Sequence, residues 1–83
     1  MGKVAISIKV LPESPEADME RIVEEIKNKI EVRDVKIEPF VFGLKVIKLL
    51  VVREDAEGSE EVENALRSIK GVGEVEVESL TLL

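Results

Sequence analysis

The sequence predicts an α+β fold in which four strands form one antiparallel sheet and two helices cover one face of it. Four stretches alternate apolar and polar residues or are apolar throughout, as strands are, and two others repeat apolar residues every three or four positions, as helices do. Their order is strand, helix, strand, strand, helix, strand. With 83 residues, the chain suits one small domain, which we expect to span residues 1–83.

The first strand and the first helix are predicted in the first third of the chain. In Val4–Val10 the apolar residues occupy alternate positions, which is typical of a strand with one face on the core. Leu11–Pro15 breaks this pattern, and Ser14 followed by Pro15 indicates a helix start, with serine as the N-cap and proline in the first helical position. Apolar residues then recur at helical spacing among glutamates and lysines, so this helix should bury one stripe.

Two strands of different character follow in the middle of the chain. Val35 and Ile37 alternate with charged residues before Pro39, which is typical of a short edge strand, where a missing backbone donor does little harm. The next stretch, Leu44–Val52, is apolar on both strand faces, so we expect it to be a central strand.

A second helix and a last strand complete the pattern. Ser59 is a predicted N-cap after a polar loop, and Gly71 has the conformational freedom that favours a helix end. From Val72 onward, valines alternate with glycine and glutamate, which predicts a strand. Beyond Ser79 the apolar residues continue on the other strand face, so we expect a bulge or a frayed end there.

The order of the elements predicts the topology. Because strand–helix–strand crossovers are right-handed, both helices should lie on one face of a four-stranded antiparallel sheet, with the first and third strands at its centre. This is the ferredoxin-like β-α-β-β-α-β arrangement. The other face stays uncovered, so either Ile47, Leu49 and Val51 or the opposite set must look away from the helices. With Leu80 and Leu82 these side chains should form an exposed apolar patch, either ordinary surface or a contact between copies.

Composition argues against several classes of protein. The chain has no histidine, no cysteine and no glycine-rich phosphate loop, so it lacks the commonest general base, the common transition-metal ligands and a nucleotide site. We therefore predict no enzyme activity, no cofactor and no metal. The net charge of −6 disfavours nucleic acid and membrane as direct partners and favours a basic protein. The absence of cysteine, of a secretory signal and of a long apolar run predicts a cytoplasmic protein.

Two groups of residues deserve comparison with known kinds of site. The acidic residues Glu54, Asp55 and Glu57 lack the alternating ligand spacing of a calcium loop. Phe40 and Phe42, the two aromatic residues of the chain, stand at the entrance of the third strand. RNA-binding sheets instead place aromatic residues inside the central strands together with basic residues, so base stacking fits poorly here. We expect both rings at a surface corner.

Three segments resemble archaeal translation elongation factor 1-beta: Val10–Pro15, Pro39–Leu44 and Val51–Gly58. The similarity extends over the whole chain, and the second segment is its most distinctive part. The resemblance implies a guanine-nucleotide exchange factor for elongation factor 1-alpha, the GTPase that delivers aminoacyl-tRNA to the ribosome. It also implies the ferredoxin-like fold of the exchange domain.

The resemblance further implies which residues contact the GTPase at the start of the third strand. Matching the motif places the contacting phenylalanine at Phe42, with Gly43 allowing the approach of the partner and Pro39 opening the motif. The alternative role for Phe42 is a cap on the open end of the core.

The C-terminal tail, which comprises Thr81, Leu82 and Leu83, is the second contact that the resemblance implies. Eukaryotic members carry a lysine next to the last residue, which intrudes on the magnesium site of the GTPase, and here that position is Leu82. The tail then acts sterically, or else Lys45 or Lys48 supplies the charge.

Two functions of other classes share this topology. An ACT-type ligand-sensing regulatory domain has the same order of strands and helices, and Lys70–Gly73 is the comparable glycine-containing turn in this chain. A structural homodimer that pairs through the open sheet face is the other alternative. We expect a monomer, and equilibrium sedimentation tests this, because a monomer at high concentration counts against both alternatives.

Overall fold

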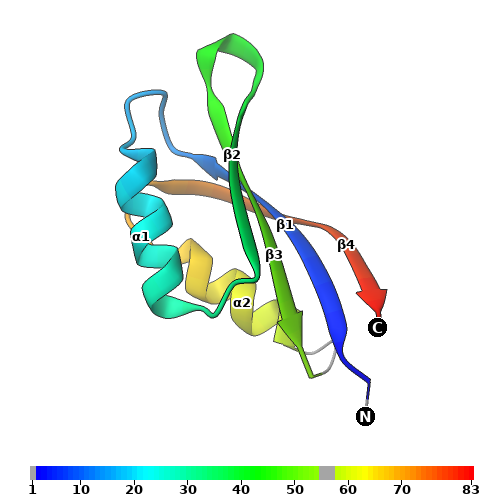
Figure 1. Cartoon of the computed structure of the whole chain (residues 1–83). Helices are drawn as coiled ribbons and strands as arrows, with labels where there is room; N and C mark the ends of the chain where they lie inside the picture. Colours follow the sequence, from blue (N-terminus) through cyan, green and yellow to red (C-terminus); the bar gives the residue numbers. More distant parts are fainter. Residues whose placement is uncertain (1, 55–57) are drawn as a thin grey trace.

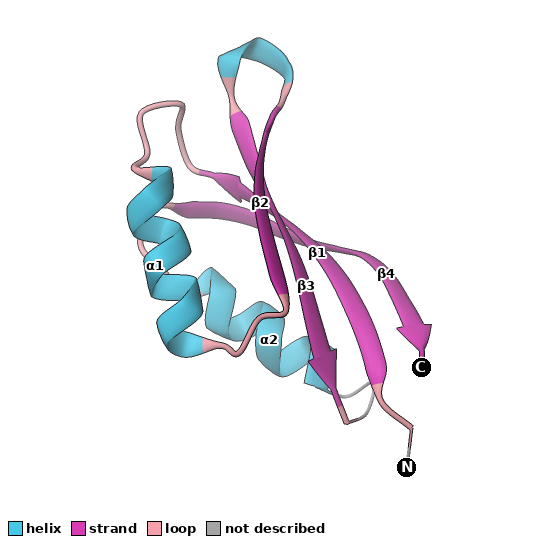
Figure 2. Cartoon of the chain, viewed as in Figure 1, coloured by secondary structure: helices cyan, strands magenta, loops and turns pink. Residues whose placement is uncertain are grey.

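The computed structural model describes residues 2–54 and 58–83. Four strands form one sheet, and two helices pack on one of its faces (Figures 1 and 2). All neighbouring strands are antiparallel, in the order β2-β3-β1-β4. The predicted ferredoxin-like β-α-β-β-α-β fold is confirmed, with β1 and β3 at the centre of the sheet. The elements are β1 (Val4–Pro12), α1 (Met19–Lys29), β2 (Asp34–Pro39), the 3-10 turn η1 (Val41–Gly43), β3 (Lys45–Arg53), α2 (Gly58–Arg67) and β4 (Val72–Leu82).

The core lies between the sheet and the two helices. In β3, Ile47, Leu49 and Val51 face the helices, because each pairs with a buried residue of β1. Each fully buried side chain of this size contributes about 1.5–3 kcal/mol relative to an exposed one. The core side chains that are at most 1% exposed are Val4, Ile6, Ile8, Val10, Ile22, Ile26, Ile47, Val51, Val62 and Leu66.

The open face of the sheet carries the opposite set of β3 among charged side chains, but Val46 is buried and Leu50 and Val52 are half-buried, so the exposed apolar patch predicted there is not formed. On this face Lys9 of β1 lies opposite both Lys48 of β3 and Glu76 of β4. Nζ of Lys9 is 3.4 Å from a carboxylate oxygen of Glu76, and Nζ of Lys48 is 2.8 Å and 2.9 Å from the two carboxylate oxygens of Glu78. These ion pairs between strands offset the repulsion between the two lysines.

A bulge in β4 places the end of that strand on the helix side of the sheet. Between Ser7 and Ile8 of β1 the register with β4 shifts by one residue, which leaves Glu78 as an extra residue. The bulge predicted in this region is confirmed. Beyond it, Leu80 and Leu82 lie opposite buried residues of β1, so they do not belong to the open face, and they are 41% and 76% exposed.

Both predicted helix N-caps are wrong. Asp18, not Ser14, caps α1, and a carboxylate oxygen of Asp18 accepts the backbone N–H three residues later at 3.1 Å. The reason is that β1 runs on to Pro12, where it still pairs with β4, so the following residues are needed to turn the chain toward the helix. Helix α2 begins at Gly58, which makes Ser59 part of its first turn.

The molecule is elongated, with principal dimensions of 42 × 22 × 17 Å. The hairpin of β2 and β3 extends past the rest of the sheet at one end, and both chain termini lie at the other (Figure 1). Neither helix, within the part of the chain that is described, is long and apolar enough to cross a lipid bilayer. The long axis therefore separates the hairpin turn from the C-terminal residues.

Candidate partner-binding site

The turn between β2 and β3, residues 40–44, carries three exposed apolar side chains and is called the tip below. Phe40 is 40% exposed, Val41 55% and Phe42 93%. Two backbone hydrogen bonds close the turn: Phe40 donates its N–H to the carbonyl of Leu44 at 2.8 Å, and Leu44 donates to the carbonyl of Val41 at 3.1 Å. The tip is thus a closed turn with an apolar surface.

The tip holds Phe42 in a conformation that phenylalanine rarely adopts. Its φ of 59° and ψ of 30° lie in the left-handed region, which costs about 1–3 kcal/mol for a residue of this kind. Gly43 follows with a φ of 76°, which favours glycine. A β-carbon at Gly43 would meet no atom within 4 Å, so the chain has room for a side chain at this position. Glycine is favoured there because of the backbone angle alone. Pro39 forms the last cross-strand pair before this turn.

The two phenylalanines of the tip have different surroundings. Nζ of Lys9 lies 5.5 Å from the centroid of the Phe40 ring, within the range of a cation–π interaction. Because Lys9 belongs to the open face, Phe40 packs back onto its own sheet. Phe42 is 93% exposed, so it does not cap the core. The structure therefore rules out the alternative role of Phe42 as a cap.

The C-terminal tail is a regular continuation of β4. Thr81 and Leu82 pair with the first residues of β1, and Leu83 donates its backbone N–H to the carbonyl of Lys3 at 2.8 Å. The side chains of Leu82 and Leu83 are 76% and 69% exposed. The tail thus combines a backbone fixed by strand pairing with an apolar surface.

The structure places the tip and the tail at opposite ends of the molecule and does not bring them together (Figure 1). Pro39, Phe42 and Gly43 lie at the hairpin end, and residues 81–83 lie at the end of the chain termini. Between the two ends, β3 alone runs about 20 Å from its pairing with Val10 to its pairing with Val4. A partner that contacts both sets must therefore span this length.

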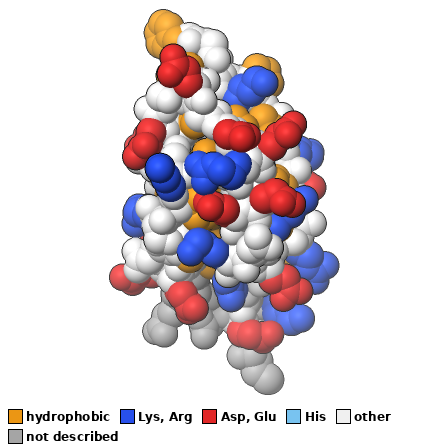
Figure 3. Space-filling model, turned by 90° about the vertical axis from the view of Figure 1, so that its left-hand side faces the viewer, with side chains coloured by type: hydrophobic (Ala, Val, Ile, Leu, Met, Phe, Trp, Pro, Cys, Tyr) orange, Lys and Arg blue, Asp and Glu red, His pale blue; other side chains and the backbone are white. Residues whose placement is uncertain are grey.

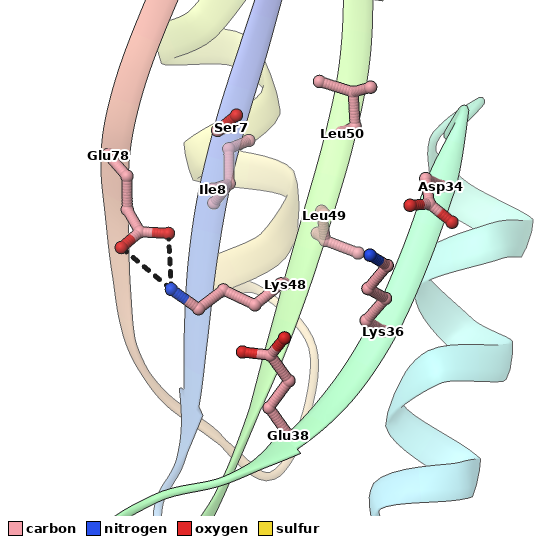
Figure 4. Close-up of a pocket in the computed structure, with 9 residues that line it drawn as sticks. All are labelled: Ser7, Ile8, Asp34, Lys36, Glu38, Lys48, Leu49, Leu50 and Glu78. Carbon is pink, nitrogen blue, oxygen red and sulfur yellow. Dashed lines mark hydrogen bonds and ion pairs between the residues drawn. The ribbon is translucent and has the colours of Figure 1, made fainter.

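Neither lysine considered as a source of charge lies at the tail. Lys45 begins β3 beside the tip, and Lys48 lies in the middle of the open face. The carboxylate of Glu78 accepts hydrogen bonds from Lys48 with both of its oxygens (Figure 4). This hydrogen bonding raises the pKa of Lys48 above its ordinary value of 10.5. Lys48 is thus engaged at the bulge of β4 and not at the tail.

The open face is hollowed around this ion pair. A cavity of about 320 Å³ lies there, and Figure 4 shows that its lining comes from all four strands. Among the residues that the structure describes, no three histidine, cysteine, aspartate or glutamate side chains group closely enough to hold a metal ion. The charged residues that line the cavity are Asp34, Lys36, Glu38, Lys48 and Glu78.

Sequence analysis missed two grooves beside the N-terminal half of α1. Their volumes are about 540 Å³ and 290 Å³, and Asp18 and Glu20 line both. Ile37 of β2, which lines the larger groove, is 42% exposed. An apolar residue between two charged ones on a predicted edge strand was the available signal for this surface. The helix that forms the other wall has an ordinary amphipathic pattern, which gave no signal of a groove.

The chain is similar to archaeal elongation factors along its whole length. Residues 5–83 match the EF-1 guanine nucleotide exchange domain. Elongation factor 1-beta of Methanospirillum hungatei is 48% identical over 85 residues, which cover all of both chains. The protein of the same name from Methanocorpusculum labreanum is 39% identical over 85 residues, which cover 100% of this chain and 99% of the relative. Elongation factor 1-beta of Aeropyrum pernix is 44% identical over 87 residues, which cover 98% of this chain and 97% of the relative.

Solved structures of a different kind of protein share the fold. The solution structure of the ACT domain from GTP pyrophosphokinase of Chlorobium tepidum has a TM-score of 0.73 and 18% identity, covering 93% of this chain and 88% of that one. The crystal structure of that domain has a TM-score of 0.66 and 16% identity, and the match covers 90% of this chain and 97% of that one. At such identity the likeness shows the fold alone. The sequence matches, by contrast, extend over whole proteins, and the chain belongs to the EF-1 guanine nucleotide exchange domain family of elongation factor 1-beta.

Proposed function

We propose that this protein is a guanine-nucleotide exchange factor that promotes GDP release from elongation factor 1-alpha, so that GTP can rebind during translation elongation. The family and the relatives named elongation factor 1-beta support the proposal. In this proposal the protein is not an enzyme and uses no cofactor. It acts in the cytoplasm as a monomer, and its partner is the GTPase itself and not nucleic acid or a membrane.

Exchange of this kind requires only a difference between two binding affinities. A factor that binds the nucleotide-free GTPase more tightly than the GDP-bound GTPase must weaken GDP binding by the same ratio. A coupling free energy of about 1–3 kcal/mol changes affinity about 5- to 150-fold. The protein therefore needs a contact surface that favours one state of the GTPase, and it needs no nucleotide site of its own.

The observation that carries the proposal is the state of Phe42. Its ring is 93% exposed, and its backbone is held in the left-handed region. The backbone angle costs the free protein about 1–3 kcal/mol, and the exposed ring gains no burial energy that would offset this cost. Burial of such a ring against a partner gains about 1.5–3 kcal/mol. If only the nucleotide-free GTPase makes this contact, the gain is as large as the coupling of about 1–3 kcal/mol. These features favour Phe42 as a contact residue.

The tail is the second proposed contact. Leu82 occupies the position of the lysine that eukaryotic members carry, so this chain has no cation there to compete with magnesium. We place a steric, apolar contact at the tail, made by Thr81, Leu82 and Leu83. Strand pairing with β1 fixes the backbone of these residues and supports this role, since a rigid tail can displace parts of a partner.

Release of a fluorescent GDP analogue from archaeal elongation factor 1-alpha tests the proposal. The loaded GTPase is mixed with excess unlabelled nucleotide, with and without this protein at a substoichiometric concentration. We expect faster release, and turnover of several GTPase molecules by each molecule of the factor. Unchanged release, with a cognate GTPase and a protein shown to be folded by circular dichroism, contradicts the proposal.

A further inference from the structure

The N-terminal half of α1 stands between two grooves. The larger, of about 540 Å³, lies between α1 and β2, and the smaller, of about 290 Å³, opens toward the tip, where Gly43 and Lys45 line it. Asp18 and Glu20 line both grooves, so the two form one continuous surface, called the helix–hairpin surface below. The residues of the larger groove are Asp18, Glu20, Arg21, Val23, Glu24 and Ile37.

The wall of the larger groove that β2 forms is apolar. Ile37 pairs with the buried Ile47, so it lies on the helix side of the sheet, yet 42% of it is exposed. Val23 of α1 is half-buried at the edge of the core and lines the same groove. Farther along the hairpin, Val41 and Phe42 are exposed as well. Exposed apolar side chains therefore occur both at the groove and at the tip.

The wall that α1 forms is acidic. Glu20 and Glu24 are exposed one helical turn apart, and neither takes part in the ion pairs that occur within the described residues. Arg21, the cation of this helix that lines the groove, is engaged elsewhere. One guanidinium nitrogen is 3.1 Å from a carboxylate oxygen of Glu25, and another donates to the carbonyl of Lys70 at 2.7 Å. The charges of Glu20 and Glu24 are thus left for the solvent or a partner.

Figure 3 shows the side of the molecule that faces left in Figure 1, where α1 lies. Apolar side chains are visible at the upper end and in the gaps between charged side chains below it. Apolar and charged side chains are therefore interspersed on this side of the molecule.

We propose that the helix–hairpin surface docks a basic, amphipathic segment of the GTPase partner, adjacent to the contact made by Phe42. An apolar side chain of this segment lies against Ile37 and Val23, and lysine or arginine side chains pair with Glu20 and Glu24. The inference rests on the proposed exchange function and deepens it by assigning the chemistry of the partner surface.

Charge selects this occupant over others. The chain carries a net charge of −6, and some of its carboxylates gather at the groove wall, where they repel the phosphates of nucleic acid and of anionic lipids. A second copy of the chain would bring the same acidic wall and an equally acidic surface. A basic protein segment is attracted by the field of the whole molecule and by the two unengaged glutamates, which also speeds association at low salt.

Charge reversal on α1, compared with the same change on α2, tests the inference. Glu20→Lys with Glu24→Lys is the test variant, and Glu60→Lys with Glu61→Lys is the control, because Glu20, Glu60 and Glu61 all stand in the first turn of a helix and all four glutamates are exposed. Binding to nucleotide-free elongation factor 1-alpha is measured by surface plasmon resonance at two salt concentrations.

We expect the α1 variant to bind on the order of tenfold more weakly than the α2 control at low salt, mainly through slower association, and the gap to narrow at high salt. The neutral pair Glu20→Gln with Glu24→Gln should show an intermediate loss, and it guards against misfolding caused by the lysines. Equal affinity of all variants, with GDP release still accelerated by the unmodified protein, overturns this inference alone. If the unmodified protein neither binds the GTPase nor accelerates release, the proposed function fails with it.

Discussion

The tip and the tail both expose apolar side chains, but they are built in opposite ways. At the tip, one turn closed by two backbone hydrogen bonds forces Phe42 into the left-handed region. At the tail, Leu82 and Leu83 are held by ordinary strand pairing and are exposed because they end an edge strand. The tip therefore presents its side chain at a cost in backbone energy, whereas the tail does not. A strained exposed residue is the stronger sign of function.

The largest expected effect is at the tip. Phe42→Ala should lower stimulated GDP release on the order of tenfold or more, because it removes a side chain whose burial gains about 1.5–3 kcal/mol. Stopped-flow release of a fluorescent GDP analogue at matched concentrations measures this. Phe40→Ala is the matched control, and it should affect release less and stability more, since Phe40 packs against Lys9. Equal loss of activity in both variants would show that exchange depends on the conformation of the whole tip and not on a contact made by the ring of Phe42.

The tail should give a smaller effect on exchange. Leu82→Ala with Leu83→Ala should slow stimulated release about fivefold, because exposed leucines at a chain end bury less surface on contact than a projecting ring, worth about 1 kcal/mol. The same assay measures the rate, and thermal unfolding provides the control, because neither side chain belongs to the core. A loss larger than that of Phe42→Ala would reverse the ranking of the two ends.

Strain at the tip can be separated from contact by comparing two replacements of the same ring. Asparagine tolerates the left-handed region better than alanine, so Phe42→Asn should be more stable than Phe42→Ala by about 1 kcal/mol, or roughly 4–8 °C in melting temperature. Both variants should lose exchange activity to a similar degree, because both lack the ring. Calorimetry checks the stability difference. Identical melting temperatures would mean that the backbone relaxes once the ring is gone.

Much of the fold could be predicted because its signals are local. The alternation in β1 and the helical spacing in α1 identify their elements, and the change of phase near Ser79 identified the bulge that Glu78 forms. The face of β3 that meets the helices could not be chosen, because this strand is apolar on both sides. The register of β3 with β1 determines which face meets the helices, and this register joins residues that are far apart in sequence.

The misses also have physical causes. Ser14 is as good a capping residue as Asp18, and only the extension of β1 to Pro12 determines which of them caps the helix. The sequence placed Phe42 at a surface corner, but its left-handed backbone was not predictable, since phenylalanine has no preference for that region. The grooves of the helix–hairpin surface depend on how α1 packs beside β2. The residue pattern within each element does not determine this packing.

The smallest expected effect concerns the bulge, which sets the position of the tail but not that of the tip. The hydrogen bond from Lys48 to Glu78 raises the pKa of Lys48 above 10.5. A raised folded-state pKa means that the pair stabilises the protein fully below pH 10.5 and that this contribution is lost as the pH rises through the folded value. Glu78→Gln removes the partner charge, so this variant should show a smaller fall in urea midpoint between pH 9 and pH 11.5 than the unmodified protein.

All other ionisable groups are the same in both proteins, so their contributions cancel in this comparison. The effect should be small, because both side chains are about one-third exposed and such pairs are screened by solvent. If Glu78→Gln leaves the tip unaffected and still slows GDP release, the bulge acts through the tail, and the two ends contribute to exchange by separable routes. If the two midpoints fall in parallel with pH, the ion pair contributes nothing to stability, and strand pairing alone holds the tail in place.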